Sequence, residues 1–250
     1  MQEFDFLKSS RQVHQLRAPH PSAEGWNRGK KNMKRPLTIA AILTVLAWIG
    51  TCVVYPRLPE IMTSHWNIHG QADGFAPKWQ IAFIMPAVMV LMLGLAWVLP
   101  KISPKRFEID TFAQTYGMVM LLVVALMGYL HVMTLWGGAN GRIDVGRALF
   151  GGIFAFFALM GNYLSKVRRN FFVGVRTPWT LASERVWNDT HRLAAKTFVA
   201  AGVGGVIVTL LGLPLAVWMG TAIGLVLLGG LIPVVYSLVH YKRLEARGEL

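Results

Sequence analysis

Six long apolar runs alternate with polar segments along the chain. The runs cover residues 37–55, 81–99, 113–136, 148–164, 197–218 and 221–240. Each is close to the roughly 20 residues that a helix needs to cross about 30 Å of hydrocarbon. All 12 acidic and 25 basic residues fall outside the runs, as expected because a charge at mid-membrane costs about 2.5–3.5 kcal/mol on insertion scales. The pattern predicts an all-α integral membrane protein with six transmembrane helices.

Basic residues are concentrated in every second polar segment. Residues 1–36, 100–112, 165–196 and 241–250 together hold 21 of the 25 Lys and Arg residues, and the intervening loops hold 4. Cytoplasmic loops of membrane proteins carry the excess of Lys and Arg, so the alternation predicts that the N and C termini are both cytoplasmic. The loop after the first span is then on the outer side.

The composition agrees with a membrane protein. The chain is 54% hydrophobic and 15% charged, whereas an ordinary soluble domain is about 25% charged. Its net charge of +13 is spread over segments on one membrane face, which favours contact with anionic lipid over direct binding of nucleic acid. The single cysteine, Cys52, lies inside the first span, so neither a disulfide framework nor a cysteine-based metal site can form within one chain.

The polar segments divide the chain into three parts. Residues 1–35 lack an apolar core, and we expect them to be a disordered, basic cytoplasmic extension. Residues 36–99 hold the first two spans and a structured outer loop at 56–80, and residues 100–250 hold four further spans. Small residues let helix backbones approach closely, so the many glycines of the last two spans predict a tight hairpin around a turn near residues 219–221.

The outer loop contains a candidate metal-binding pattern. His65, His69 and Asp73 are spaced four residues apart, which would place three ligands on one face if the segment were helical. Two glycines interrupt that helix, so we expect no metal site. Instead, His65, Asn67 and Asp73 are expected to hydrogen-bond the loop together.

The segment before the fifth span has the features of a helix start. Thr177 suits the N-cap, and Pro178 suits the first helical position, where its missing N–H has no intrahelical partner anyway. Apolar residues then recur at helical spacing, which predicts an amphipathic helix lying in the membrane surface before span five. Arg176 precedes the positive end of this helix, so another partner is expected for it, such as Glu184, Asp189 or a phosphate.

The same segment carries a long and specific motif. Residues 161–192 read GNYLSKVRRNFFVGVRTPWTLASERVWNDTHR, with a Gly-Asn pair, an Asn-x-x-x-Gly-x-Arg-Thr-Pro-Trp-Thr core and a later Trp and Thr-His-Arg. This string resembles the signature of the SdpI family of bacterial membrane proteins, and the SdpI-like segment spans 148–218. The candidate site residues here, called the loop motif below, are Asn162, Asn170, Gly174, Arg176, Thr177, Pro178, Trp179, Thr180, Trp187, His191 and Arg192.

The outer loop carries a second resemblance. Its sequence, LPEIMTSHWNIHGQADGFAPKW, is similar to the domain of unknown function that often precedes the SdpI segment. The two resemblances imply a protein of the bacterial plasma membrane that gives immunity against a secreted, membrane-active peptide toxin. They also imply signalling by capture of a cytoplasmic regulator. On this hypothesis the loop motif holds the spans together or binds the regulator. The outer-loop residues expected to contact the toxin are His65, Trp66, Asn67, Gly70 and Asp73.

Other classes of function are weighed against this one. No catalytic or cofactor-binding motif is present, so we expect neither an enzyme nor a cofactor, and His191 is expected to belong to the scaffold. The predicted spans hold no Asp, Glu, Lys or Arg, and His131 lies near the outer end of the third span, which disfavours coupled transport. Two alternatives stay open: a signalling receptor or anchor without an immunity role, and a transporter of small solutes or lipids.

Overall fold

The computed structural model describes residues 23–67, 72–104, 109–140 and 144–250. Six of its helices are long and apolar enough to cross a membrane, which confirms the predicted architecture. The elements are α2 (Ala23–Val54), the 3-10 turn η1 (Tyr55–Arg57), β1 (Ile61–Trp66), β2 (Ala72–Pro77), α3 (Lys78–Ile102), the 3-10 turn η3 (Ile109–Phe112), α4 (Ala113–Asn140), α5 (Val145–Leu164), α6 (Pro178–Ala182), α7 (Glu184–Leu210) and α8 (Leu215–Ala246).

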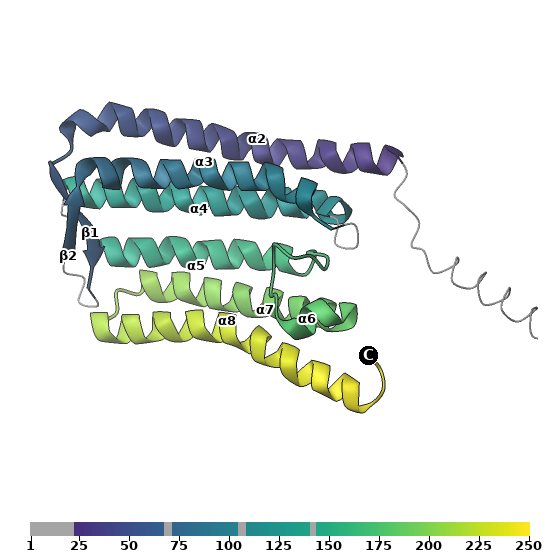
Figure 1. Ribbon diagram of the computed structural model, residues 1–250. Coiled ribbons are helices and arrows are strands. Elements are labelled where there is room, and N and C mark those ends of the chain that lie inside the picture. Colours follow the sequence, from purple (N-terminus) through teal and green to yellow (C-terminus); the bar gives the residue numbers. More distant parts are fainter. Residues whose placement is uncertain (1–22, 68–71, 105–108, 141–143) are drawn as a thin grey trace, which may run out of the picture.

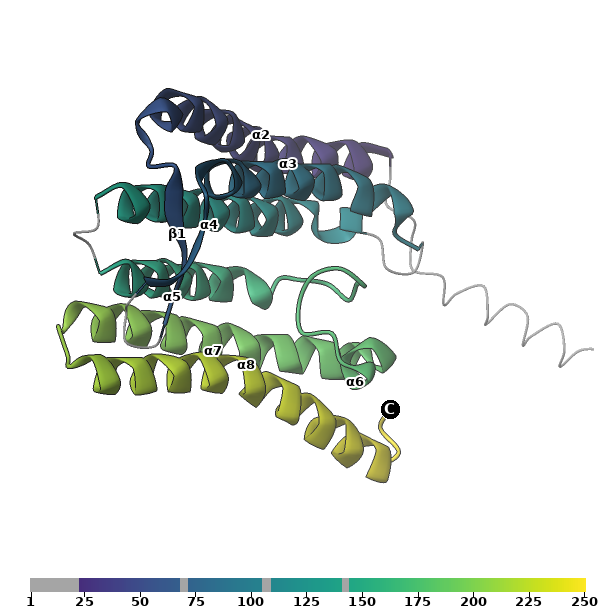
Figure 2. The same ribbon diagram turned by 60° about the vertical axis from the view of Figure 1, so that its left-hand side comes forward.

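The long helices lie side by side in two groups. Helices α2, α3 and α4 contact one another, α7 contacts both α5 and α8, and the contact of α4 with α5 joins the groups. Strands β1 and β2 lie at one end of the bundle, called the hairpin end below (Figure 1). The segment 165–177, α6 and the C-terminus lie at the opposite end, called the loop end (Figures 1 and 2). The end of α3 and the segment after α5 therefore lie at the same end as the C-terminus.

Helix α2 begins earlier than the first apolar run. It starts at Ala23 and continues through Pro36 to Val54, so the expectation of disorder is wrong for residues 23–35. This stretch is rich in Lys, Arg and other good helix formers, which extend the span helix toward the N-terminus. The rest of the predicted extension, residues 1–22, lies outside the described residues.

The outer loop folds as a β-hairpin. Strands β1 and β2 pair antiparallel, with Ile61 opposite Pro77, and the register is irregular around His65. Met62 is 1% exposed and packs with Leu58 and Ala82 against the ends of the helices. An ion pair between Lys78 and Glu60, 2.8 Å long, closes the base of the hairpin. The strands are thereby fixed to the bundle.

The segment before the fifth span forms two helices where a single one was predicted. Helix α6 has only five residues and ends before Ser183, whose backbone is extended and whose Oγ accepts from the N–H of Val186 at the start of α7. Helix α7 then continues to Leu210 without a turn. Val186 and Trp187 are both 0% exposed, so these two apolar residues pack inside the protein.

The turn between the last two spans also differs from the prediction. It lies between Leu210 and Leu215 and not near residues 219–221. Gly212 has a φ of +63°, a left-handed conformation that glycine adopts without a steric penalty. Pro214 directly precedes α8, where its fixed φ suits the start of a helix. The sequence Leu-Gly-Leu-Pro thus contains the stop and start signals.

The glycines of α7 serve mainly the contact with α5. A Cβ atom on Gly202 would lie 2.6 Å from the carbonyl oxygen of Phe154, and one on Gly161 would lie 2.8 Å from the carbonyl oxygen of Ala195. Toward α8, a Cβ on Gly204 would meet only ordinary contacts with Leu225. The closest backbone approach is therefore found between α5 and α7. The last two spans also pack together as predicted, and a Cβ atom on Gly229 of α8 would lie 3.2 Å from the Cβ of Ala201 in α7.

Candidate functional site

The loop motif gathers at the loop end of the bundle. Its residues come from the end of α5, the segment 165–177, α6 and the first turns of α7, and in Figure 1 these parts lie together. Thr177 caps α6 and accepts from the N–H of Thr180, with Pro178 in the first turn. This confirms the predicted N-cap and helix start.

Asn170 organises the segment between α5 and α6. It is 0% exposed. Its Oδ1 accepts from the N–H groups of Phe172 and Val173 at 2.7 and 2.8 Å, and its Nδ2 donates to the carbonyls of Arg168 and Val173 at 2.8 and 3.0 Å. Four bonds from one amide match the hydrogen-bonding capacity of the group almost completely. The Asn170 side chain thus pairs with backbone N–H and C=O groups of this loop, which in a helix or strand would pair with other backbone groups.

Trp187 and His191 form the inner wall of the loop. Their rings stack at a centroid distance of 4.1 Å, and both residues are buried. The indole Nε1 of Trp187 donates to the carbonyl of Val167 at 2.8 Å, which fixes the start of the loop on α7. Gly174, with a φ of +111°, passes so close to His191 that a Cβ atom on it would overlap with the imidazole Nε2.

The hydrogen bonds of His191 define its tautomer. Nε2 accepts from the N–H of Val175 at 3.0 Å, and Nδ1 lies 2.8 Å from the carbonyl of Trp187. A backbone N–H can only donate and a carbonyl can only accept, so the ring is neutral with its proton on Nδ1. Both nitrogens are used for structure. This geometry supports the expectation that His191 belongs to the scaffold.

Thr177 also connects the loop to the last helix. Its hydroxyl lies 3.0 Å from that of Ser237 in α8. Ser237 donates to the carbonyl of Val234 at 2.7 Å, so it accepts from Thr177. The sequence did not identify Ser237 as the partner of Thr177, because a serine in an apolar span does not indicate which residue it contacts.

The arginines of the loop bind backbone carbonyls. Arg176 donates to the carbonyl of Phe171, so the predicted pairing with Glu184 or Asp189 is wrong. Asp189 instead pairs with His240 of α8 at 2.9 Å. Arg169, which sequence reasoning did not single out, donates to the carbonyl of Leu181 at 3.2 Å at the end of α6. Unsatisfied carbonyls at a helix end are the groups that cationic side chains favour.

Six of the eleven residues of the loop motif keep some exposure: Arg176 and Pro178 are exposed and Gly174 is half-buried, besides the three described next. Asn162 is exposed and donates to the carbonyl of Ala158 in its own helix at 2.9 Å. Arg192 is exposed and lies 3.7 Å from Asp189, a long contact for an ion pair. Trp179 is half-buried. The loop motif therefore combines a buried network of five residues with a partly exposed outer surface.

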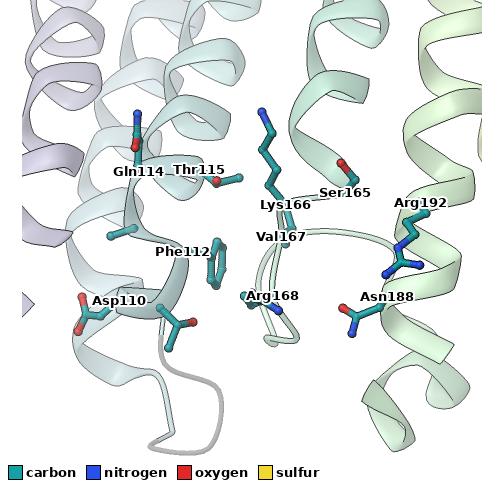
Figure 3. A pocket seen from close by; sticks show the side chains of 12 residues that line it. Asp110, Phe112, Gln114, Thr115, Ser165, Lys166, Val167, Arg168, Asn188 and Arg192 are labelled. Atoms are coloured by element: carbon teal, nitrogen blue, oxygen red, sulfur yellow. The ribbon is translucent and has the colours of Figure 1, made fainter. Parts of the chain in front are cut away.

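Beside this network lies a polar cleft of about 550 Å³. Lys166 and Arg168 enter it from the segment after α5, and Arg192 and Asn188 enter it from α7, as Figure 3 shows. Asp110, in η3, is the acidic residue that lines the cleft. Three cations against one carboxylate give the cleft a positive potential that favours anionic groups.

The predicted outer-loop site is at the hairpin end, opposite the loop motif. His65 Nδ1 and Asp73 Oδ1 lie 2.6 Å apart across the two strands, which confirms the predicted bond between them. Trp66 ends β1 and is followed by Asn67, whereas Gly70 and His69 lie outside the described residues. In the ranges that are described, no three His, Cys, Asp or Glu side chains gather as a metal-binding group. The two predicted sites are thus separate.

Comparisons with known proteins agree with this arrangement. Residues 166–237 match the SdpI/YfhL protein family, and residues 42–90 match the domain of unknown function DUF1648. The chain is 28% identical over 217 residues to the Immunity protein SdpI of Bacillus subtilis (strain 168), an alignment that covers 86% of this chain and 98% of that protein. No solved structure matches.

The fold and the matched segments define a multi-pass protein of the bacterial plasma membrane. Its residues 166–237 are similar to the SdpI/YfhL protein family, and a DUF1648 segment that contains the hairpin lies ahead of them.

Proposed function

We propose that this chain is an immunity protein that protects the bacterium carrying it from a secreted, membrane-active peptide toxin. The observation that carries the proposal is the extent of the similarity, which covers 98% of a protein named for immunity and includes both the hairpin and the loop motif. The buried groups of the loop motif are bonded to one another and to backbone, as in a scaffold. This supports a protein that acts by binding and not by catalysis.

The hairpin end offers the surface on which a toxin would first be met. His65 and Asp73 are exposed there, and Phe75 and Trp79 are 63% and 55% exposed. Aromatic side chains of this kind favour the membrane–water interface. We place this end on the outer side, on the basis of the Lys and Arg distribution. A peptide entering the bilayer from outside would then pass the hairpin.

The test is the membrane potential of sensitive bacteria exposed to the toxin that the Bacillus subtilis immunity protein counters. Cells expressing this chain should keep their potential at toxin concentrations that depolarise cells with an empty vector, and the relative serves as the positive control. Two further strains express His65→Ala or Arg176→Ala at equal level. Loss of protection only in the first assigns the toxin contact to the hairpin, and loss only in the second assigns the essential role to the loop motif.

Depolarisation of cells that carry the intact chain, while the relative protects, would contradict immunity against that toxin.

A second candidate function is the capture of a cytoplasmic regulator, and the positive cleft favours it. Lys166, Arg168 and Arg192 lie at the end that holds the basic segments, where an acidic surface of a soluble protein would be attracted. If this function operates, a cytosolic protein crosslinks to the wild-type chain when toxin is present. The crosslink weakens with salt and is lost in the double variant Lys166→Glu, Arg168→Glu. A crosslink that the charge reversal does not change would exclude the cleft.

A further inference from the structure

A polar pair lies between α2 and α4 inside the apolar part of the bundle. Thr51 Oγ1 and His131 Nε2 are 2.7 Å apart, and the residues are 1% and 2% exposed. Both belong to segments that are apolar enough to span the membrane. Such groups are costly in hydrocarbon, and a polar residue there calls for a partner or a role.

The hydrogen bonds determine which atom of this pair is unused. The hydroxyl of Thr51 donates to the carbonyl of Ala47 at 2.8 Å, so its oxygen accepts from Nε2–H of His131. The neutral ring then has its proton on Nε2, and Nδ1 is a hydrogen-bond acceptor. Nδ1 is buried and has no hydrogen-bond partner among the described residues. A buried acceptor left in this state destabilises a protein unless a ligand or water satisfies it.

A pocket of about 320 Å³ lies beside this pair, between α2 and α4 at the hairpin end. His131 and Thr51 line it, and the rest of its wall is apolar, with Leu46 and Leu135 on the two helices and Leu58 below the hairpin. Its volume is about ten times the ~30 Å³ that one water occupies, and it falls at the small end of ligand pockets. An apolar pocket with one polar group that fixes orientation is the usual form of a ligand site.

We propose that this pocket binds one side chain of a membrane-inserted peptide, which donates a hydrogen bond from a hydroxyl or N–H group to Nδ1 of His131. The proposal rests on the immunity function above and assigns the toxin as the peptide. The apolar wall excludes charged side chains, because an unpaired charge there would lose its hydration. Ser, Thr, Tyr and Trp each supply a donor on an otherwise tolerable side chain. A peptide from the outer leaflet reaches the pocket directly beneath the hairpin.

In this arrangement the hairpin and the pocket make different contacts with the peptide. Leu58 lines the pocket and also packs against Met62 of β1, so the hairpin and the pocket share one wall. The hairpin presents exposed polar and aromatic groups, and the pocket offers a buried acceptor. An apolar peptide without a donor would leave Nδ1 unsatisfied, and the site discriminates against it.

The first experiment tests the chemistry of the pocket without a toxin. The purified full chain in lipid vesicles is photolabelled with a diazirine-bearing octanol, and in parallel with the methyl ether of the same molecule, which has no donor. Labelled residues are mapped by mass spectrometry. The alkanol is expected to label pocket residues several-fold more than the ether. In His131→Phe the labelling by the alkanol should fall to the level of the ether.

Two further variants keep this test independent of folding defects. Gly50 lines the pocket, and a Cβ atom there would meet nothing within 4 Å, so Gly50→Leu occupies pocket space while His131 is kept, and it should lower the alkanol labelling. Thr134 donates to Leu130 within α4 at 2.8 Å and does not line the pocket, so Thr134→Val should label as the wild type. Equal labelling by alkanol and ether, or alkanol labelling unchanged in both pocket variants, would overturn the proposed pocket.

The second experiment measures protection by the same variants. The toxin concentration that halves the membrane potential is expected to fall about tenfold in His131→Phe, which corresponds to ~1.4 kcal/mol of binding, and to stay unchanged in Thr134→Val. Unchanged protection in both His131→Phe and Gly50→Leu would exclude the toxin from the pocket and leave immunity intact. Failure of the wild-type chain to protect would reject the proposed function, and with it the toxin as occupant.

Discussion

Gly174 lies against the imidazole ring of His191, at a distance that leaves no room for a side chain. The glycine also has a φ of +111°, which residues with a Cβ atom rarely adopt. The contact allows the N–H of Val175 to reach Nε2 of His191. One position of the loop motif thus meets a steric and a conformational requirement together.

Gly174→Ala is therefore expected to lower the free energy of unfolding by about 3 kcal/mol, from backbone strain of ~1–3 kcal/mol and overpacking of similar size. Chemical unfolding in detergent micelles measures this. Gly212→Ala has strain at a φ of +63° but open space, so it should cost about 1–2 kcal/mol. Gly220→Ala has neither problem and should be close to neutral. An equal effect of all three variants would contradict the steric account.

Asn170→Ala should destabilise the protein by about 2–4 kcal/mol, because partly buried backbone N–H groups of Phe172 and Val173 lose their acceptor. Asn162→Ala is the matched control within the same motif. It is exposed and its amide bonds only its own helix, so its effect should stay within about 0.5 kcal/mol. Thermal unfolding followed by tryptophan fluorescence distinguishes them, and a larger effect at Asn162 would reject the structural role of Asn170.

A double-mutant cycle tests the bond between Thr177 and Ser237. Thr177→Val and Ser237→Ala are expected to show a coupling of about 0.5–1 kcal/mol, the usual size of a hydrogen bond between membrane helices. The control cycle pairs Thr177→Val with Ser165→Ala, an exposed serine, and its coupling should lie within the ~0.3–0.5 kcal/mol expected of independent sites. Equal coupling in both cycles would mean that the loop is not held by α8.

Close packing of α5 and α7 predicts a strong effect of Gly202→Leu. The new side chain would meet the backbone of Ala158 and Phe154, and the helices would have to separate. Monodisperse protein on size exclusion should decrease sharply, with a loss of about 3 kcal/mol or more in stability. Gly220→Leu places the same side chain in open space and should leave both quantities near the wild-type values. A well-folded Gly202→Leu protein would contradict the packing.

The predicted orientation can be tested with single cysteines in a Cys52→Ser background. Ser64 in β1 and Ser165 after α5 are both exposed and lie at opposite ends of the bundle. In intact cells, a membrane-impermeant maleimide should label Ser64→Cys, and it should label Ser165→Cys only after lysis. The reverse pattern would invert the topology and move the toxin-facing roles to the other end.

The sequence was sufficient to predict features that depend on residues close together in the chain. Apolar length gave the six spans, and the Thr177-Pro178 pair gave the start of α6, because a cap depends on adjacent residues. The end of α7 could also have been placed, since Gly212 and Pro214 carry the stop and start signals. The long glycine-rich run concealed these signals, and the turn was expected several residues too late.

Features that depend on distant residues could not be predicted in the same way. The glycine pattern indicates close packing but does not say on which neighbour, and α7 packs its glycines on α5. The carbonyl that Arg176 binds and the hydroxyl that Thr177 faces are set by the path of the chain. Likewise, His131 was visible as a polar residue in a span, but its unused nitrogen depends on the bond with Thr51 in another helix.

The attachment of the loop to α7 and α8 also sets an order for biosynthesis. Val175 needs His191, and Thr177 needs Ser237, so both bonds join the loop to residues that leave the ribosome after it. A nascent chain that has inserted only its first four spans lacks these partners. The loop can therefore form both bonds only after the last helix has entered the membrane. Its final conformation is reached only once the whole chain has been inserted.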